Sequence, residues 1–443
     1  MNKRYKDIGF NKDVLFLFDL FNEQLQADLY LVGGAVRDIL LNKEIKDYDF
    51  ATNLTPEEIM DIFKDSEEIK IIPTGIKHGT VTLRYKESNY EITTYRTDGN
   101  YSDNRRPDCV KYVRTIEEDL ARRDFTINAI AFNPNTGFID PFKGMEHLVL
   151  SKLFAVRNAD ERLQEDYLRA LRAIRFCAKY NMELDSEVRI AILKNKNLIK
   201  FISKERIFDE VSKILLLNPS LELLKLTFLV IFNESEVIGA PFLSNKMRKT
   251  EIYSVESDFK LAMCWSQFLD GIPNLTKTLK DLRMPSKLIK EILCISEFRS
   301  HLSVISTEDV ENYNDLAKNL DKKYYYQLKT AISDIKDLDL TRAVLTYYKL
   351  TSQANEVVKS YRVYLELLDI IIKEKHSIFV KDLNISGKDV EDLCNEILPK
   401  GYRKDIISRT LETLIDYVRM EKDSNNKESL TSIARYYITK ELL

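Results

Sequence analysis

The chain has 443 residues, of which 44% are hydrophobic and 31% charged, and its net charge is −3. This length allows two to four domains with ample core, and the charge excludes a strongly basic nucleic-acid coat while leaving room for a local basic groove. Five cysteines without a C-x-x-C pair, an N-terminus without a signal-peptide pattern and no bilayer-length apolar run together predict a cytoplasmic protein with reduced thiols and no membrane association.

The first elements surround a pair of glycines. Residues 11–28 predict an amphipathic helix that leads into a short strand over residues 28–32. The sequence then runs through Gly33 and Gly34 into a helix over residues 35–41. Small residues at such a turn let backbone N–H groups approach an anion, so the pattern predicts a phosphate cradle.

Two aspartates, Asp47 and Asp49, begin the next predicted strand, over residues 47–52. Residues two apart in a strand point to the same face, so the two carboxylates should lie together opposite the cradle. This arrangement suits Mg²⁺ held against a triphosphate. A lone D-x-D is more often a solvated turn, and it is the spacing from the two glycines that favours the metal site.

A hairpin is predicted next. Residues 55–58 (T-P-E-E) have the pattern of a helix start, and residues 79–85 and 90–95 predict the two strands of the hairpin. Glu91 is then either a surface residue on an edge strand or a third carboxylate beside the two aspartates. The polar stretch over residues 97–108 predicts a loop.

The segment over residues 117–129 sets Arg123, Asp124 and Asn128 in an apolar frame, where unpaired burial is costly. In one interpretation Arg123 holds phosphate, and Asp124 and Asn128 bond ribose hydroxyls. In the other, the segment is a helix cap with a salt bridge. The sequence D-P-F-K-G over residues 140–144 predicts a turn that closes this part of the chain.

Residues 159–180 predict one amphipathic helix. Its polar face carries Asp166, Arg169, Arg172 and Arg175, each three residues apart. Such stripes usually form ion pairs on an exposed helix. Three arginines against only two acids, Glu165 and Asp166, also suit a surface that grips phosphate and offers one acceptor and one donor to a base.

Helices are predicted almost throughout the rest of the chain. The predicted helices cover residues 203–217, 221–232, 258–269, 275–282, 286–298, 314–332, 341–349 and 356–373, with two or three more over residues 381–434. Eight of the twelve glycines precede residue 150. The predicted fold class is therefore α+β, with an α+β first third followed by helices.

Several motifs stand in order along the first half: G-G-A-V-R-D before D-Y-D, E-I-T-T-Y-R, R-R-D-F-T-I-N-A, D-P-F-K-G and E-D-Y-L-R-A-L-R-A-I-R-F. Together they resemble bacterial class II tRNA nucleotidyltransferases, the CCA-adding enzymes of the tRNA nucleotidyltransferase/poly(A) polymerase family. The resemblance is close over residues 28–217 and weak beyond them. It implies a polymerase β-like head with a small mixed sheet (1–150), a helical neck that recognises the base (151–217), a helical body (218–313) and a tRNA-binding tail (314–443).

The resemblance also implies residue roles. Asp47 and Asp49 would hold two Mg²⁺ ions, and Gly34, Arg37 and Arg123 would contact the nucleotide. Asp166 and Arg169 would form an amino-acid template for the base, and Arg172 and Arg175 would add nucleotide or phosphate contacts. The sequence departs from the family at Asn42, where glycine is usual, and over residues 396–404, where only Pro399 and Gly401 of the tail pattern remain.

The implied reaction adds C, C and A to the 3′ end of tRNA from CTP and ATP. The partners expected are the tRNA acceptor stem and elbow, CTP and ATP, with monomer and homodimer both open. An enzyme adding only A or only CC, and a bacterial poly(A) polymerase, share these motifs, although the intact loop over residues 97–108 disfavours CC addition. A non-catalytic RNA-binding protein descended from such an enzyme is the alternative from another class.

Overall fold

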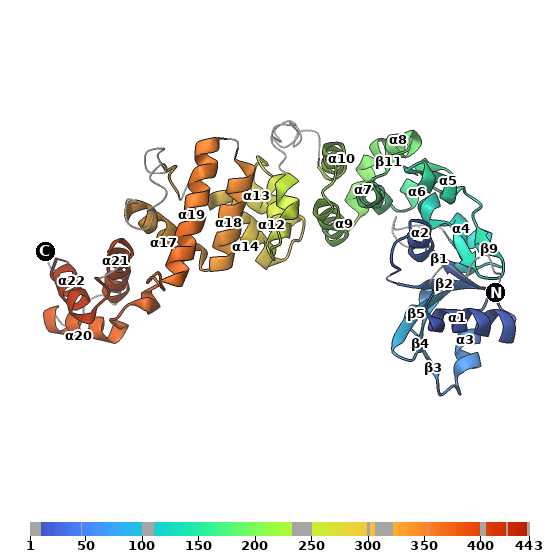
Figure 1. Cartoon of the computed structure of the whole chain (residues 1–443), viewed down its shortest axis with the longest axis horizontal. Coiled ribbons are helices and arrows are strands. Elements are labelled where there is room, and N and C mark those ends of the chain that lie inside the picture. The colour runs from blue at the N-terminus through green and yellow to red at the C-terminus, as the bar shows by residue number, and fades with distance from the viewer. Residues whose placement is uncertain are drawn as a thin grey trace. The chain divides into compact units, whose positions relative to one another are not determined.

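The computed structural model describes residues 10–45, 47–99, 110–232, 250–298, 302–305, 322–352, 354–398, 405–421 and 424–440. Most of the predicted loop over residues 97–108 lies outside this description, as do Cys109, Pro399 and Gly401. The chain forms two compact units, residues 1–239 with 281–283 and residues 240–280 with 284–443 (Figure 1).

The first unit is built on a seven-stranded sheet in the order β3-β4-β5-β2-β1-β8-β9. Its strands are β1 (Leu29–Val32), β2 (Asp49–Thr52), β3 (Ile69–Ile72), β4 (Thr80–Tyr85), β5 (Ser88–Thr94), β8 (Ala131–Asn133) and β9 (Gly137–Ile139). Neighbouring strands are antiparallel except β2 and β5, which are parallel. The predicted α+β class and small mixed sheet are confirmed, and so is the hairpin of β4 and β5.

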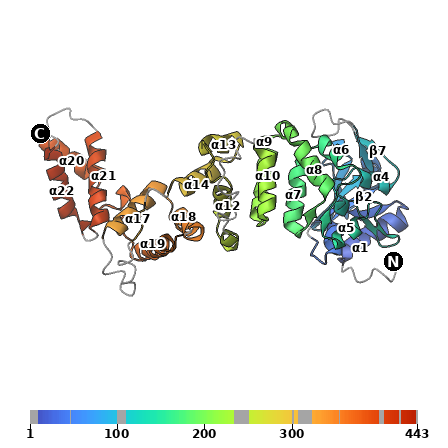
Figure 2. The ribbon, with the colours of Figure 1, turned by 90° about the horizontal axis from the view of Figure 1, so that it is seen from above.

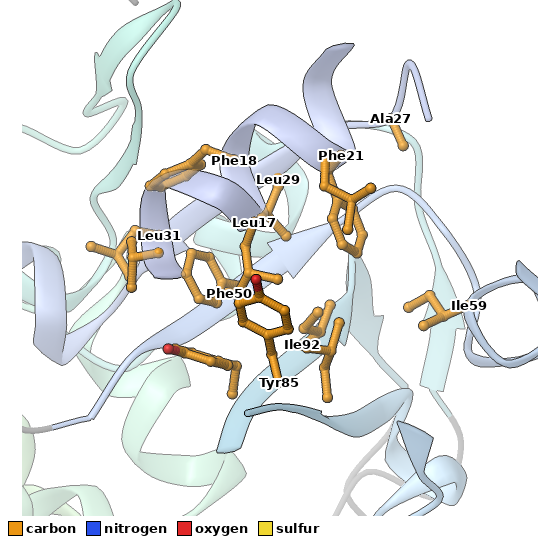
Figure 3. Packing of buried hydrophobic residues seen from close by; sticks show 14 of the residues in the cluster. Leu17, Phe18, Phe21, Ala27, Leu29, Leu31, Phe50, Ile59, Tyr85 and Ile92 are labelled. Atoms are coloured by element: carbon orange, nitrogen blue, oxygen red, sulfur yellow. The ribbon is translucent and has the colours of Figure 1, made fainter. Parts of the chain in front are cut away.

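Alternation along β1 gives the sheet two buried faces. Leu29 and Leu31 join a core with α1 (Lys12–Asp19) and α3 (Pro56–Phe63), whereas Tyr30 and Val32 join a second core with α4 (Ile116–Ala121). In the first core, the ring of Phe18 from α1 meets that of Phe50 from β2 edge-on, with 5.5 Å between centroids (Figure 3). Burial on both faces holds β2 in place, and Asp49 is the first residue of β2.

The start of α3 agrees with the prediction from the sequence, whereas the end of α1 does not. Thr55 caps α3 in a reciprocal capping box with Glu58, as the T-P-E-E pattern predicts. The predicted helix over residues 11–28 is shorter, because α1 gives way at Leu20 to a π-helical turn that ends at Gln24.

The predicted helix over residues 159–180 is two helices, α6 (Ala159–Glu165) and α7 (Leu168–Tyr180). The prediction of one helix was wrong because Asp166 adopts an extended conformation, with φ −148° and ψ 102°. Its carboxylate Oδ1 accepts from the Leu168 N–H at 3.0 Å, and its carbonyl accepts from the Arg169 N–H at 3.0 Å. A short acidic side chain that satisfies backbone donors in this way competes with helix continuation.

The remaining elements of this unit are short strands and helices. They are β6 (Arg96–Asp98), β7 (Val110–Tyr112), η3 (Ile76–His78), η4 (Thr126–Asn128), α2 (Gly34–Leu40), α5 (Gly144–Val149), β10 (Lys152–Leu153), β11 (Glu183–Leu184), α8 (Ser186–Lys194), η5 (Lys196–Phe201), α9 (Lys204–Leu216) and α10 (Leu221–Ile231). The arginine-bearing helix α7 packs against α9 and α10, and it also contacts the short parallel strands β10 and β11.

The second unit is helical throughout its described part, as predicted. Its elements are η7 (Thr250–Ser254), α12 (Lys260–Phe268), α13 (Leu275–Asp281), α14 (Ser286–Glu297), α17 (Lys322–Ile335), α18 (Leu338–Thr351), α19 (Asn355–Lys373), η10 (Val380–Asp382), α20 (Gly387–Ile397), α21 (Asp405–Met420) and α22 (Lys427–Lys440). Helices α20, α21 and α22 pack around one core of their own (Figures 1 and 2). Within the described ranges, every helix is too short or too polar to cross a membrane.

Candidate active site

The glycine turn between β1 and α2 requires glycine for two separate reasons. Gly33 has φ +67°, which a residue with a side chain rarely adopts. A Cβ at Gly33 would also lie 2.9 Å from Nη1 of Arg123. The turn therefore brings the Arg123 guanidinium directly against the backbone at the start of α2.

Arg123 is held in this position by a buried carboxylate. Asp119, in α4, is fully buried and accepts from Arg123 Nη2 at 3.2 Å, from Arg122 Nε at 2.9 Å and from the Arg96 backbone N–H at 3.3 Å. Burial alone would raise the pKa of Asp119, but Arg122 and Arg123 outweigh it and the pKa is lowered. Asp119 is therefore an anchor that fixes the Arg123 side chain, a role that the sequence analysis did not assign.

The three predicted carboxylates line one cavity of about 700 Å³. Asp49 in β2 stands opposite Glu91 in the parallel strand β5, and Asp47 lies two residues before Asp49. Enclosure by the protein, followed by repulsion from Glu91, raises the pKa of Asp49 against the attraction of Arg123. The β1–β2 register pairs Leu31 with Phe50, so Asp49 begins β2 beside the end of β1 from which the glycine turn leaves.

This donor set fits Mg²⁺. Magnesium in nucleotide sites is usually held by one or two carboxylates, together with waters and substrate phosphates. Among the described residues, no group of three or more Asp, Glu, His or Cys side chains is arranged to hold a metal ion. Glu91 thus shares the cavity with Asp47 and Asp49 without forming a closed three-carboxylate cage with them.

A second network joins η4 to α7. Asp124 is buried and accepts from Arg172 Nε at 2.8 Å and Nη2 at 2.6 Å, from Asn128 Nδ2 at 3.0 Å and from the Phe125 N–H at 2.9 Å. Burial raises the pKa of Asp124, but Arg172 and Asn128 outweigh it and lower the pKa to about 2. The pair predicted to bond ribose, Asp124 and Asn128, is therefore bonded to each other and to protein groups in this structure.

Arg37 completes the network from the other side. It is buried, donates to Asn128 Oδ1, and forms an ion pair with Asp38 at 3.1 Å. Its guanidinium carbon also lies 5.4 Å and 4.6 Å from the ring centroids of Phe176 and Tyr180 in α7. Arg37 thus connects α2 to α7.

The two residues predicted as the base template lie at the junction of α6 and α7, and each has a partner. Asp166 Oδ2 accepts from Arg206 Nη2 in α9 at 2.8 Å. Arg169 donates to the carboxylate of Glu165 and to the carbonyl of Arg162. Arg206, like Asp119, was not identified from the sequence, since only the fold brings α9 beside residue 166.

The arginine stripe is compensated in the fold. Glu165 binds Arg169, Asp124 binds Arg172, and Glu210 of α9 accepts from Arg175 Nε at 2.7 Å. The sequence indicated more arginines than acids on this stripe. That count was incomplete, because two of the three carboxylates that pair with the arginines come from outside residues 159–180. Charge pairing between elements orients the stripe.

The first unit thus combines a mixed sheet, a carboxylate at the start of β2 with a second one two residues before it, and a glycine turn against which an anchored arginine lies. Residues 29–153 match the family described as the poly A polymerase head domain, and residues 181–226 match the probable RNA- and SrmB-binding site of polymerase A. Over these two segments the chain is therefore similar to the poly A polymerase head and its RNA-binding region.

Individual proteins similar to this chain carry more specific names. The chain is 46% identical over 188 residues to the CCA-adding enzyme of Geobacillus kaustophilus and 49% identical over 186 residues to that of Lactobacillus johnsonii. These matches cover 42% of this chain and 45% and 46% of those proteins, so they span about half of the relatives' length. The Bacillus stearothermophilus CCA-adding enzyme in complex with CTP is similar over 98% of this chain and all of that chain, at 27% identity and a TM-score of 0.71.

Proposed function

We propose that the protein adds C, C and A to the 3′ end of tRNA from CTP and ATP, without a nucleic-acid template. The observation that carries this proposal is that Asp47, Asp49 and Glu91 line one cavity, and that Asp49 begins β2 beside the end of β1, where the glycine turn lies against the anchored Arg123. Cavities of this composition suit the attack of a ribose 3′-hydroxyl on the α-phosphorus of a nucleotide, with pyrophosphate as the leaving group. The relatives named CCA-adding enzyme support the choice of substrate.

Asp47 and Asp49 would hold two Mg²⁺ ions, with Glu91 on the same cavity wall. When bound, magnesium lowers the pKa of the attacking hydroxyl and neutralises charge on the triphosphate. Arg123 places a further positive charge beside the backbone of Gly33, and Asp119 fixes its direction. The chain's own side chains then have mainly to bind and orient the substrates.

Asp166 and Arg169 select the base in this proposal. A carboxylate accepts and a guanidinium donates, which matches the amino group and the adjacent ring nitrogen of cytosine or adenine. Uracil and guanine present the reverse pattern, and two mismatched polar contacts at about 1–3 kcal/mol each discriminate by roughly a hundredfold or more. The hydrogen bonds from Arg206 and from the Leu168 N–H hold the carboxylate of Asp166 in one orientation.

Three tRNA transcripts test the proposal: one that ends before CCA, one that ends after C-C, and one complete. Each is incubated with the protein, Mg²⁺ and labelled CTP or ATP. We expect CTP incorporation only on the first transcript and ATP incorporation on the second. Incorporation of ATP alone would assign an A-adding enzyme, long ATP tails would assign a poly(A) polymerase, and no incorporation on any transcript would overturn nucleotidyl transfer to tRNA.

A further inference from the structure

Two aromatic rings on α7 lie beside several cationic side chains, and two of these side chains have no role in the proposed chemistry. Phe176 and Tyr180 stack with their centroids 6.3 Å apart. Five cations lie over them: Arg37, Lys43, Arg172, Arg175 and Lys179 (the cation cluster). The Nζ atoms of Lys43 and Lys179 stand 4.6 Å and 5.0 Å from the Tyr180 centroid.

The three arginines of this cluster are each neutralised by a carboxylate, Asp38, Asp124 or Glu210. Lys43 and Lys179 differ, because both are exposed and neither has an acidic partner in the described part of the chain. Partial burial and then the neighbouring Arg37 and Arg175 lower the pKa of Lys179, and Asp38 opposes them. The cluster therefore carries two uncompensated positive charges at the surface, at the ends of flexible side chains.

We propose that Lys43 and Lys179 bind backbone phosphates of the RNA substrate close to its growing 3′ end. This inference rests on the proposed function. Lysine is a compact point charge without the planar fork of arginine, so two lysines suit phosphodiester contact more than the reading of a base edge.

The choice of phosphates near the 3′ end follows from the distance between the cation cluster and the glycine turn. Gly33 precedes α2 and Lys43 follows it, and the seven residues of α2 span ~10 Å at ~1.5 Å per residue. At ~3.4 Å per nucleotide step of a stacked strand, that is about three nucleotides from the reacting end. The triphosphate belongs at the Gly33 and Arg123 end of α2, so it does not account for Lys43.

The test compares the full chain with the double variant Lys43→Ala and Lys179→Ala, using a tRNA transcript that ends after C-C, so that its last three nucleotides are single-stranded. Binding is measured without nucleotide or metal over a series of salt concentrations. Each lost phosphate contact removes about 0.7 from the slope of log K against log salt, so we expect the slope to fall by about 1.4 and the affinity at ~0.15 M salt to fall about tenfold. The variant Lys43→Arg with Lys179→Arg keeps both charges and should keep the slope.

The matched control is Lys152→Ala with Lys200→Ala, which removes two lysines that also stand over aromatic rings, at 5.6 Å and 5.0 Å, but lie outside the cluster. An equal loss of slope in this control, or an unchanged slope in the Lys43 and Lys179 double variant, would overturn the inference. So would a raised KM for CTP with unchanged RNA affinity, since the site would then serve the triphosphate. Binding needs no catalysis, so the result is distinct from the extension assay that tests the proposed function.

Discussion

Replacing Asp124 by asparagine tests whether the network between η4 and α7 is a structural clamp. The substitution keeps the size of the side chain and one carbonyl acceptor, and it removes the negative charge that faces Arg172. Both oxygens of Asp124 are already engaged, Oδ1 by Asn128 and the Phe125 N–H and Oδ2 by two nitrogens of Arg172. The variant therefore loses an acceptor as well as the charge, since the asparagine NH2 group must face N–H donors on one side, and the dependence on pH isolates the part that is due to the charge.

The size of the effect follows from the pKa. The network lowers the pKa of Asp124 from 3.8 to about 2, and one pKa unit corresponds to about 1.4 kcal/mol. The ionised carboxylate therefore contributes about 2 kcal/mol to the stability of the folded first unit at neutral pH. Because the folded pKa is the lower one, this contribution is complete above the unfolded value and is lost as the pH falls towards 2.

Urea unfolding of the parent and the Asp124→Asn variant, followed by a probe in the first unit, measures this difference. We expect the variant to be at least about 2 kcal/mol less stable at pH 7, and the gap to shrink by about 1 kcal/mol near pH 3, as the charge contribution is lost. The control is Asp61→Asn, which removes an exposed carboxylate paired with Lys64 at 2.9 Å and should change little.

A gap that stayed constant from pH 7 to pH 3 would refute the reasoning, since the charge of Asp124 would then not be its source. The same variant separates the clamp from the ribose role predicted from the sequence. A residue that bonds the ribose hydroxyls should, when replaced, reduce the preference for CTP over dCTP. A clamp should lower stability and leave that preference unchanged.

Three further predictions concern the proposed chemistry. Changing Asp47 and Asp49 together to asparagine should lower nucleotide incorporation by about 10³-fold or more in a single-turnover assay, and an unchanged rate would exclude them as metal ligands. Changing Asp166 and Arg169 together to alanine should reduce discrimination against UTP and GTP by roughly a hundredfold, measured as ratios of kcat/KM, while leaving Mn²⁺ binding intact. Gly33→Ala should lower the free energy of unfolding in urea by about 1–2 kcal/mol, because alanine strains a turn with positive φ. It should also raise KM for CTP, because the new Cβ would lie only 2.9 Å from Arg123 Nη1 and push the guanidinium away. Wild-type values for both quantities would show that the turn tolerates a side chain.

Local patterns predicted much of the first unit. The strand β1, the glycine turn, the capped start of α3 and the hairpin of β4 and β5 each depend on neighbours in sequence, and each is present. The strands β3, β8 and β9 were not predicted. They are three or four residues long, too short for alternation to distinguish them, and they exist because neighbouring strands pair with them.

The site could be predicted only up to its long-range contacts. The spacing predicted that Asp47 and Asp49 share one strand, but β2 begins at Asp49 and Asp47 precedes it. The prediction left open whether Glu91 joins them, and the sheet does set Glu91 opposite Asp49. The ion-pair partners of the charged groups could not be predicted. Arg206 is 40 residues from Asp166, and the sequence contains no periodicity that connects them. A helical wheel counts charges along one helix and therefore misses the acids that the fold supplies.

These long-range contacts form a closed circuit around the site. Arg37 in α2 bonds Asn128, Asn128 bonds Asp124, and Asp124 bonds Arg172 in α7. The circuit returns to Arg37 because its guanidinium lies over Phe176 in the same helix. Since Asn128 also presents its carbonyl to Arg123, at 3.4 Å, the arginine beside the glycine turn is tied to the helix that begins with the proposed base template. The circuit thus joins the helix that carries Arg169 to the arginine beside the glycine turn within one packed network of side-chain contacts.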